Sequence, residues 1–161
     1  MIISAALTEP TLLTLEPEPT AVVRHTGVTV SELPALFDAG YPAVVASGAR
    51  LAGPALAIYY GDPMAVFDIE IGFPVSEPLA GPIGADPAVV PANLPDGQAL
   101  ALSHHGSYDT LPEGWGRLAA EAEARGLTPR GCFEVYVTAP TPDTDPATLR
   151  SDLYLLVTES V

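Results

Sequence analysis

Lysine is absent from this sequence, and the six basic residues are arginines that are scattered singly along the chain. Twenty aspartates and glutamates give a formal net charge of −14 at pH 7. A free-standing nucleic-acid-binding protein needs clustered lysine or arginine to displace counterions from the phosphates. We therefore expect no direct binding to DNA or RNA.

Long hydrophobic runs and paired cysteines are missing as well. No segment has 18 uninterrupted apolar residues, and Met1 to Leu7 lacks the basic and apolar regions of a signal peptide. We expect a cytoplasmic protein without membrane contact. The only cysteine, Cys132, cannot form an internal disulfide and lies in an apolar run. It is expected to be a small buried side chain rather than a nucleophile.

The common catalytic motifs are also absent. The sequence has no Gly-rich phosphate loop, no nucleophile elbow and no His-Glu pair at zinc-helix spacing. His104 and His105 do not have metal-ligand spacing to each other or to a cysteine. Serine hydrolase, nucleotide and zinc mechanisms therefore have no support, and no cofactor and no metal site are expected.

What the sequence does have is enough apolar material for one folded domain. The 161 residues are 48% hydrophobic and only 16% charged, which argues against disorder. Eighteen prolines predict long, stiff connections between the ordered elements.

A weak internal repeat organises the chain. The segment from Leu51 to Pro63 resembles the segment from Leu127 to Pro140, and each follows a helical stretch. Counting back from the closing prolines pairs Tyr59 with Tyr136, and Ala57 with Glu134.

Each half also carries one helix signal. In the second half, Thr110 and Glu113 have capping-box spacing and Gly126 supplies a stop. In the first half, Thr29 and Glu32 have the same spacing. Pro42 should kink the first helix, because it removes a backbone donor.

Strand patterns surround both helices, so each half reads as strand, helix, strand, strand. The six predicted strands are residues 20–25, 56–60, 67–73, 98–103, 133–138 and 152–157. We expect an α+β fold of two such modules, about 10–75 and 96–158, joined by a linker at 76–95. A pseudo-twofold axis would relate the modules in one antiparallel sheet, with both helices on one face and a ligand cleft at the dyad.

Period-two alternation then divides each strand into two faces. Phe133 and Val135 would pack beneath the helices, which leaves Glu134 and Tyr136 on the opposite face. The same reasoning adds three residues to the face away from the helices: Tyr59, Glu70 and Tyr154. Two alternatives stay open, namely that Glu134 is a solvated residue on an exposed sheet and that the tyrosines only reflect strand propensity.

Four features together resemble the GyrI-like (gyrase-inhibitor-like) family of effector-binding domains. They are the repeat itself, the segment from Phe67 to Val75, the motif His104-His-Gly-Ser-Tyr108 before a helix that contains Trp115, and Phe133-Glu-Val-Tyr136. The resemblance covers roughly residues 19–157. It implies a fold in which two modules flank a ligand cleft. It also implies that the acidic residue at the position of Glu134 lies in an aromatic pocket for bulky, often cationic compounds.

The candidate ligand-binding residues are Glu134, Tyr136, Tyr59, Glu70, Tyr154, Tyr108 and Trp115. The helical apolar stripe favours a core position for Trp115 over a position in the ligand site.

The function expected from these features is small-molecule binding. The resemblance implies that many relatives are the sensing half of transcription regulators, joined to a helix-turn-helix segment, and we expect no such segment in this chain. A multidrug-like binding protein for sensing or sequestration is expected, with a protein partner, a homodimer or gyrase inhibition left open. The alternative is a hydrolase of strained electrophilic natural products, in which Glu134 or Glu70 would be the general acid or base.

Overall fold

The chain folds into two compact units. The computed structural model describes residues 5–61, 64–85, 88–138 and 143–159, so Pro63 and Pro140, which close the two repeats, lie outside the described residues. The first unit is Glu16–Pro95, and the second unit joins Met1–Leu15 to Asp96–Val161.

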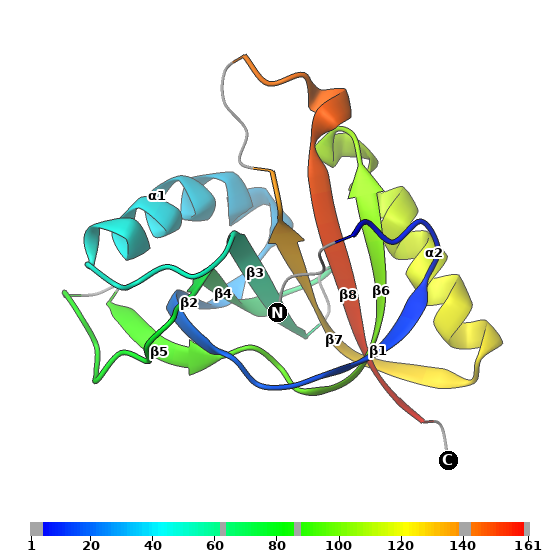
Figure 1. The fold of residues 1–161 in the computed structure, drawn as a ribbon, viewed down its shortest axis with the longest axis horizontal. Helices are drawn as coiled ribbons and strands as arrows, with labels where there is room; N and C mark the ends of the chain where they lie inside the picture. Colours follow the sequence, from blue (N-terminus) through cyan, green and yellow to red (C-terminus); the bar gives the residue numbers. More distant parts are fainter. Residues whose placement is uncertain (1–4, 62–63, 86–87, 139–142, 160–161) are drawn as a thin grey trace. The chain divides into compact units, whose positions relative to one another are not determined.

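The first unit is a four-stranded antiparallel sheet with one helix. In chain order it contains β2 (Pro19–Val28), α1 (Leu33–Ala46), β3 (Ala55–Gly61), β4 (Phe67–Pro74) and β5 (Val89–Asn93). The strands lie side by side in the order β3, β4, β2, β5. A single turn of 3-10 helix, Val30–Glu32, leads into α1. This helix packs on β4 and β2 (Figure 1).

The second unit repeats the strand-helix-strand-strand order, but its remaining strand comes before this pattern, whereas β5 of the first unit comes after it. It contains β1 (Thr11–Leu15), β6 (Gly97–His105), α2 (Leu111–Ala124), β7 (Leu127–Tyr136) and β8 (Arg150–Glu159). Short 3-10 turns lie at Tyr108–Thr110 and Pro146–Thr148. The strand order is β1, β6, β8, β7, and α2 runs along β6, β7 and β8 (Figure 1).

The α+β class and the repeated strand-helix-strand-strand pattern are thus confirmed, and all six predicted strands are present. Two further strands, β1 and β5, were not predicted. β5 lies within the expected linker and pairs with β2, whereas β1 pairs with β6, more than 80 residues later in the chain. Both are five-residue edge strands, and β5 contains Pro91, so neither has a strong strand signal of its own.

The two helices begin differently. In the first unit the backbone N–H of Thr29 donates to the carboxylate of Glu32, as capping-box spacing predicts. The capping box predicted at Thr110 does not form, because the Thr110 hydroxyl donates to the carbonyl of Ser107 instead. The Ser107 hydroxyl accepts from the N–H of Asp109 and so begins the 3-10 turn before α2.

The two units also pack their helices alike. A Cβ at Gly40 of α1 would lie 3.1 Å from a methyl group of Ile71, and one at Gly114 of α2 would lie 2.7 Å from a methyl group of Leu153. In each unit a helix glycine therefore lets the helix approach the central strand closely, at a matched position. No helix among the described residues is long and apolar enough to cross a membrane.

Candidate functional site

Glu134 lies on the face of its sheet that carries α2. It is directly opposite Leu153, which packs in one core cluster with Leu118 of α2. Opposite residues in an antiparallel pair share a face, and so do residues two apart on a strand. Tyr136 therefore faces α2 as well, and the expectation that both point away from the helices is wrong.

The error has a physical reason. The prediction gave the buried face to the aliphatic side of β7, but both sides of this strand are buried: Phe133 and Val135 on one side, and Cys132 and Glu134 on the other. Alternation identifies two faces but cannot say which one carries a helix when both are covered.

The Glu134 carboxylate lies beside Tyr136, which in turn packs against Tyr108. Glu134 is only 7% exposed, and the Tyr136 hydroxyl donates a hydrogen bond of 3.3 Å to its Oε2 atom. The Tyr136 ring packs edge-to-face against Tyr108, with ring centres 5.8 Å apart. Tyr108 is 39% exposed and so forms the solvent side of the group. We call these three residues the Glu134 cluster.

The charge of Glu134 acts on two ionisable groups near it, the thiol of Cys132 and the hydroxyl of Tyr108. Burial raises the pKa of the Cys132 thiol to about 12, and the charge of Glu134 adds to this shift. The same two causes, in the same order, raise the pKa of the Tyr108 hydroxyl. Cys132 is buried and protonated, which agrees with its expected role as a small core residue.

Tyr154 does not belong to this face. It is opposite Phe133 in the sheet, and the two rings stack with centres 4.4 Å apart and nearly parallel planes. Tyr154 is fully buried on the side away from α2. The structure therefore does not bring Tyr154 together with Glu134 and Tyr136.

Glu70 and Tyr59 lie on opposite faces of the first unit. Tyr59 is opposite Ile69, on the face that carries α1, and it packs edge-to-face against Phe67 with ring centres 5.5 Å apart. Glu70 is opposite Arg24, on the other face. The expectation that Tyr59 and Glu70 share a face is wrong, but Tyr59 does occupy the position in its unit that Tyr136 occupies in the second.

Glu70 is held by its own partners. Arg24 forms an ion pair with one carboxylate oxygen, and the Tyr60 hydroxyl donates to the other at 3.0 Å. Burial, followed by the charge of Glu70 and this hydrogen bond, raises the pKa of Tyr60. The pair therefore joins a half-exposed arginine to a nearly buried carboxylate.

Trp115 lies at the edge of the core of the second unit. It is partly buried and packs against the core cluster of the second unit. Its placement agrees with the expectation of a core residue.

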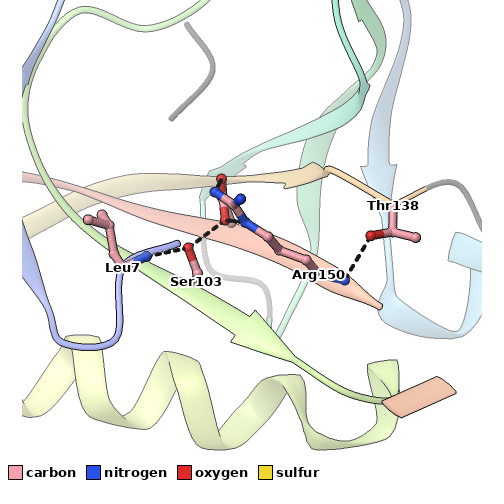
Figure 2. Close-up of polar contacts among 5 residues, drawn as sticks. Leu7, Ser103, Thr138 and Arg150 are labelled. Atoms are coloured by element: carbon pink, nitrogen blue, oxygen red, sulfur yellow. Dashed lines mark hydrogen bonds and ion pairs between the residues drawn. The ribbon is translucent and has the colours of Figure 1, made fainter. Parts of the chain in front are cut away.

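The second unit contains a buried polar network that was not predicted from the sequence (Figure 2). The Asp152 carboxylate accepts two hydrogen bonds of 3.0 Å from the Arg150 guanidinium and one of 2.7 Å from the Ser103 hydroxyl. The Ser103 hydroxyl in turn accepts from the backbone N–H of Leu7 at 2.8 Å. Arg150 and Asp152 are two apart on one strand, which was the available signal. Arg150 and Asp152 satisfy each other's hydrogen-bonding groups, which indicates a structural role for the pair.

Metal binding finds no support in the geometry. Within the described ranges no three His, Cys, Asp or Glu side chains come together in a way that could hold a metal ion.

These features define an α+β domain with a buried acidic group among aromatic rings. The chain matches the GyrI-like small molecule binding domain over residues 8–158 and belongs to that family. A comparison with curated protein sequences finds no match.

Solved structures share the fold at low sequence identity. The C-terminal domain of EcmrR is similar with a TM-score of 0.77 and 16% identity, over 96% of this chain and 99% of that one. SAV2435 bound to tetraphenylphosphonium is similar with a TM-score of 0.65 and 12% identity, over 94% of each chain. A hydrolase from Listeria innocua has a TM-score of 0.63 and 14% identity, over 96% of this chain and 94% of that one.

Proposed function

We propose that this chain binds bulky aromatic cations at the Glu134 cluster, for sensing or for sequestration. The observation that carries the proposal is the placement of a nearly buried carboxylate against the Tyr136 hydroxyl, with Tyr108 on the solvent side. Aromatic rings attract cations through their faces, and a carboxylate of low exposure attracts them further. The cluster therefore offers an aromatic cation both of the interactions that it needs.

Membership of a family of small-molecule-binding domains supports this assignment, as does the tetraphenylphosphonium that SAV2435 binds within the same fold. Tyr59 occupies in the first unit the position that Tyr136 occupies in the second, and we propose it as a ligand-binding residue of its own unit. Trp115 is the weaker candidate, since its ring packs on the core. Glu70 and Tyr154 are left out, because each lies on the face of its unit away from the helix.

The test is a titration with ligands of matched shape and different charge. Tetraphenylphosphonium, tetraphenylborate and the neutral triphenylphosphine oxide are titrated into the protein by calorimetry. The proposal expects the cation to bind most tightly, and thermal shifts of the native protein to rank the three ligands in the same order. Equal binding of the cation and the anion would contradict it.

A hydrolytic activity is the alternative, and the one supporting contact is that between Tyr136 and Glu134. A carboxylate that accepts from a tyrosine hydroxyl could act as a general acid or base on an electrophilic ligand. Glu70 is a poorer candidate, because Arg24 and Tyr60 occupy both of its oxygens. Mass spectrometry of ligands recovered after incubation separates the two functions, because only an enzyme returns altered compound. Turnover that survives Glu134→Gln would remove this residue as the acid or base.

A further inference from the structure

Three buried hydroxyl groups have no hydrogen-bond partner among the described residues: those of Thr20, Ser151 and Tyr154. An unpaired buried hydroxyl costs free energy, so each calls for an explanation. Thr20 and Tyr154 lie on the faces of their units away from the helices. Ser151 alone lies on a helix-bearing face, the one that holds the Glu134 cluster.

Strand register places Ser151 beside this cluster. In β8 it is directly opposite Tyr136 of β7 on one side and His104 of β6 on the other. Directly opposite side chains are about 4.5–5.5 Å apart at Cβ, and diagonal neighbours are about 7–8 Å apart. Glu134 is opposite Leu153, so it is the diagonal neighbour of Ser151.

The two neighbours of Ser151 across the sheet, His104 and Tyr136, differ in how closely they are packed. The His104 ring lies beneath Gly114 of α2, and its Nε2 atom is 2.8 Å from the hydroxyl of Thr110. The other side is formed by Tyr136, which is only partly buried and is packed against the more exposed Tyr108. Ser151 itself is 1% exposed, and the partly buried Tyr136 is its directly opposite neighbour, so movement of the Tyr136 ring is the route to Ser151 that the inference uses.

We infer that Ser151 is a specificity-determining residue of this site, and the inference rests on the proposed function. When an aromatic cation binds at Glu134 and turns the Tyr136 ring aside, the Ser151 hydroxyl hydrogen-bonds to a polar atom of the ligand. The ligand class is then narrower than aromatic cations in general. It consists of aromatic cations with a hydroxyl, carbonyl or amino group about one ring length from the charge, which fits the diagonal spacing of Glu134 and Ser151.

The test uses two variants and a matched ligand series. Tetraphenylphosphonium is compared with its derivatives that carry one hydroxyl in the meta or para position of one ring. Wild type, Ser151→Ala and the control Thr20→Ala are titrated with each compound. Thr20→Ala also deletes a buried, unpartnered hydroxyl, but on a face away from the site.

The expected result has three parts. Ser151→Ala binds at least one hydroxylated derivative roughly 2- to 10-fold more weakly than wild type, as one neutral hydrogen bond predicts. Tetraphenylphosphonium itself binds both proteins equally, and Thr20→Ala changes neither affinity. The melting temperature of Ser151→Ala stays the same or rises, because no bond within the protein is lost.

Two results would overturn the inference while the proposed function stands. One is the same ratio of affinities for hydroxylated and plain ligand in wild type and in Ser151→Ala. The other is a fall in melting temperature of more than about 4 °C in Ser151→Ala but not in Thr20→Ala, which would show that the hydroxyl bonds within the protein. If wild type binds none of the phosphonium compounds, the proposed function fails and the inference fails with it.

Discussion

The two units place different side chains at the same point of the same architecture. In the first unit Ala57 lies opposite Ile71, over which α1 passes at its glycine. In the second unit Glu134 lies opposite Leu153, over which α2 passes in the same way. One unit therefore forms this packing with a methyl group where the other has a buried carboxylate. The architecture therefore does not require the charge of Glu134. We attribute this charge to ligand binding.

The units differ in a second way, on the faces away from the helices. Each holds a buried carboxylate that is paired with an arginine. Asp152 is fully buried, and its partner Arg150 is mostly buried, whereas the side chain of Arg24, the partner of Glu70, is 55% exposed. Removing the arginine of a buried ion pair lowers the free energy of unfolding more than removing the arginine of an exposed pair.

The largest expected effect tests this second difference. Arg150→Met should destabilise the protein by about 3–5 kcal/mol, because it leaves the Asp152 carboxylate buried without its cation. Arg24→Met should cost less, about 1–3 kcal/mol, because water already weakens the interaction of the half-exposed Arg24 with the nearly buried Glu70 carboxylate. Urea unfolding followed by circular dichroism measures both. Equal losses in the two variants would show that the networks are equivalent.

Helix packing gives the next comparison. Gly114→Ala should destabilise the protein by about 1–2 kcal/mol, because the added methyl group would overlap Leu153 and this strain exceeds the gain in helix propensity. Gly40→Ala should be nearly neutral, since its contact with Ile71 is looser. The control is Gly116→Ala in α2, where nothing lies within 4 Å of the added carbon and a gain of up to about 1 kcal/mol is expected. A loss in Gly116→Ala would refute this account of the glycines.

The repeated tyrosines allow a comparison in ligand binding. Tyr136→Ala and Tyr59→Ala should each weaken the binding of tetraphenylphosphonium, by about 0.5–2 kcal/mol for one lost aromatic contact. Tyr136→Ala should lie at the upper end, because Tyr136 also touches Glu134 whereas the matched neighbour of Tyr59 is Ala57. Calorimetry on the two folded variants measures the difference. Unchanged affinity in both would place the ligand elsewhere.

The smallest expected effect needs no ligand. The thiol of Cys132 has its pKa raised to about 12 by burial and then by Glu134, so removal of that charge should lower the pKa. Alkylation of Cys132 at a fixed pH below 12 should then be faster in Glu134→Gln, by less than about tenfold, because burial remains. Glu123→Gln is the control, since it makes the same change in net charge at an exposed position of α2. Equal rates in the two variants would mean that Glu134 exerts no field at Cys132.

The repeat could be predicted from the sequence because local signals define it. The positions of the six strands and two helices and the pairing of Tyr59 with Tyr136 depend on signals from neighbouring residues, and all reappear in the structure. The edge strands β1 and β5 depend on partners far along the chain, and their own residues give little signal.

The candidate site was predicted less completely. Glu134 and Tyr136 do lie together, but their face was assigned wrongly because both faces of β7 are buried. Glu70 and Tyr154 were grouped with them by alternation alone, which orders residues within a strand but does not fix the register between strands. Ser151 carried no signal in the sequence, because the role that we infer for it depends on being opposite Tyr136 across the sheet.

The central claim is that Glu134 recognises the charge of the ligand and is not needed for the fold. Calorimetric titration of Glu134→Gln with tetraphenylphosphonium and triphenylphosphine oxide, beside wild type and Glu123→Gln, tests it directly. We predict a loss of about 1–3 kcal/mol for the cation, or roughly 5- to 150-fold in Kd, with the neutral ligand nearly unaffected and Glu123→Gln like wild type. Equal losses for both ligands, or no loss for the cation, would contradict the claim.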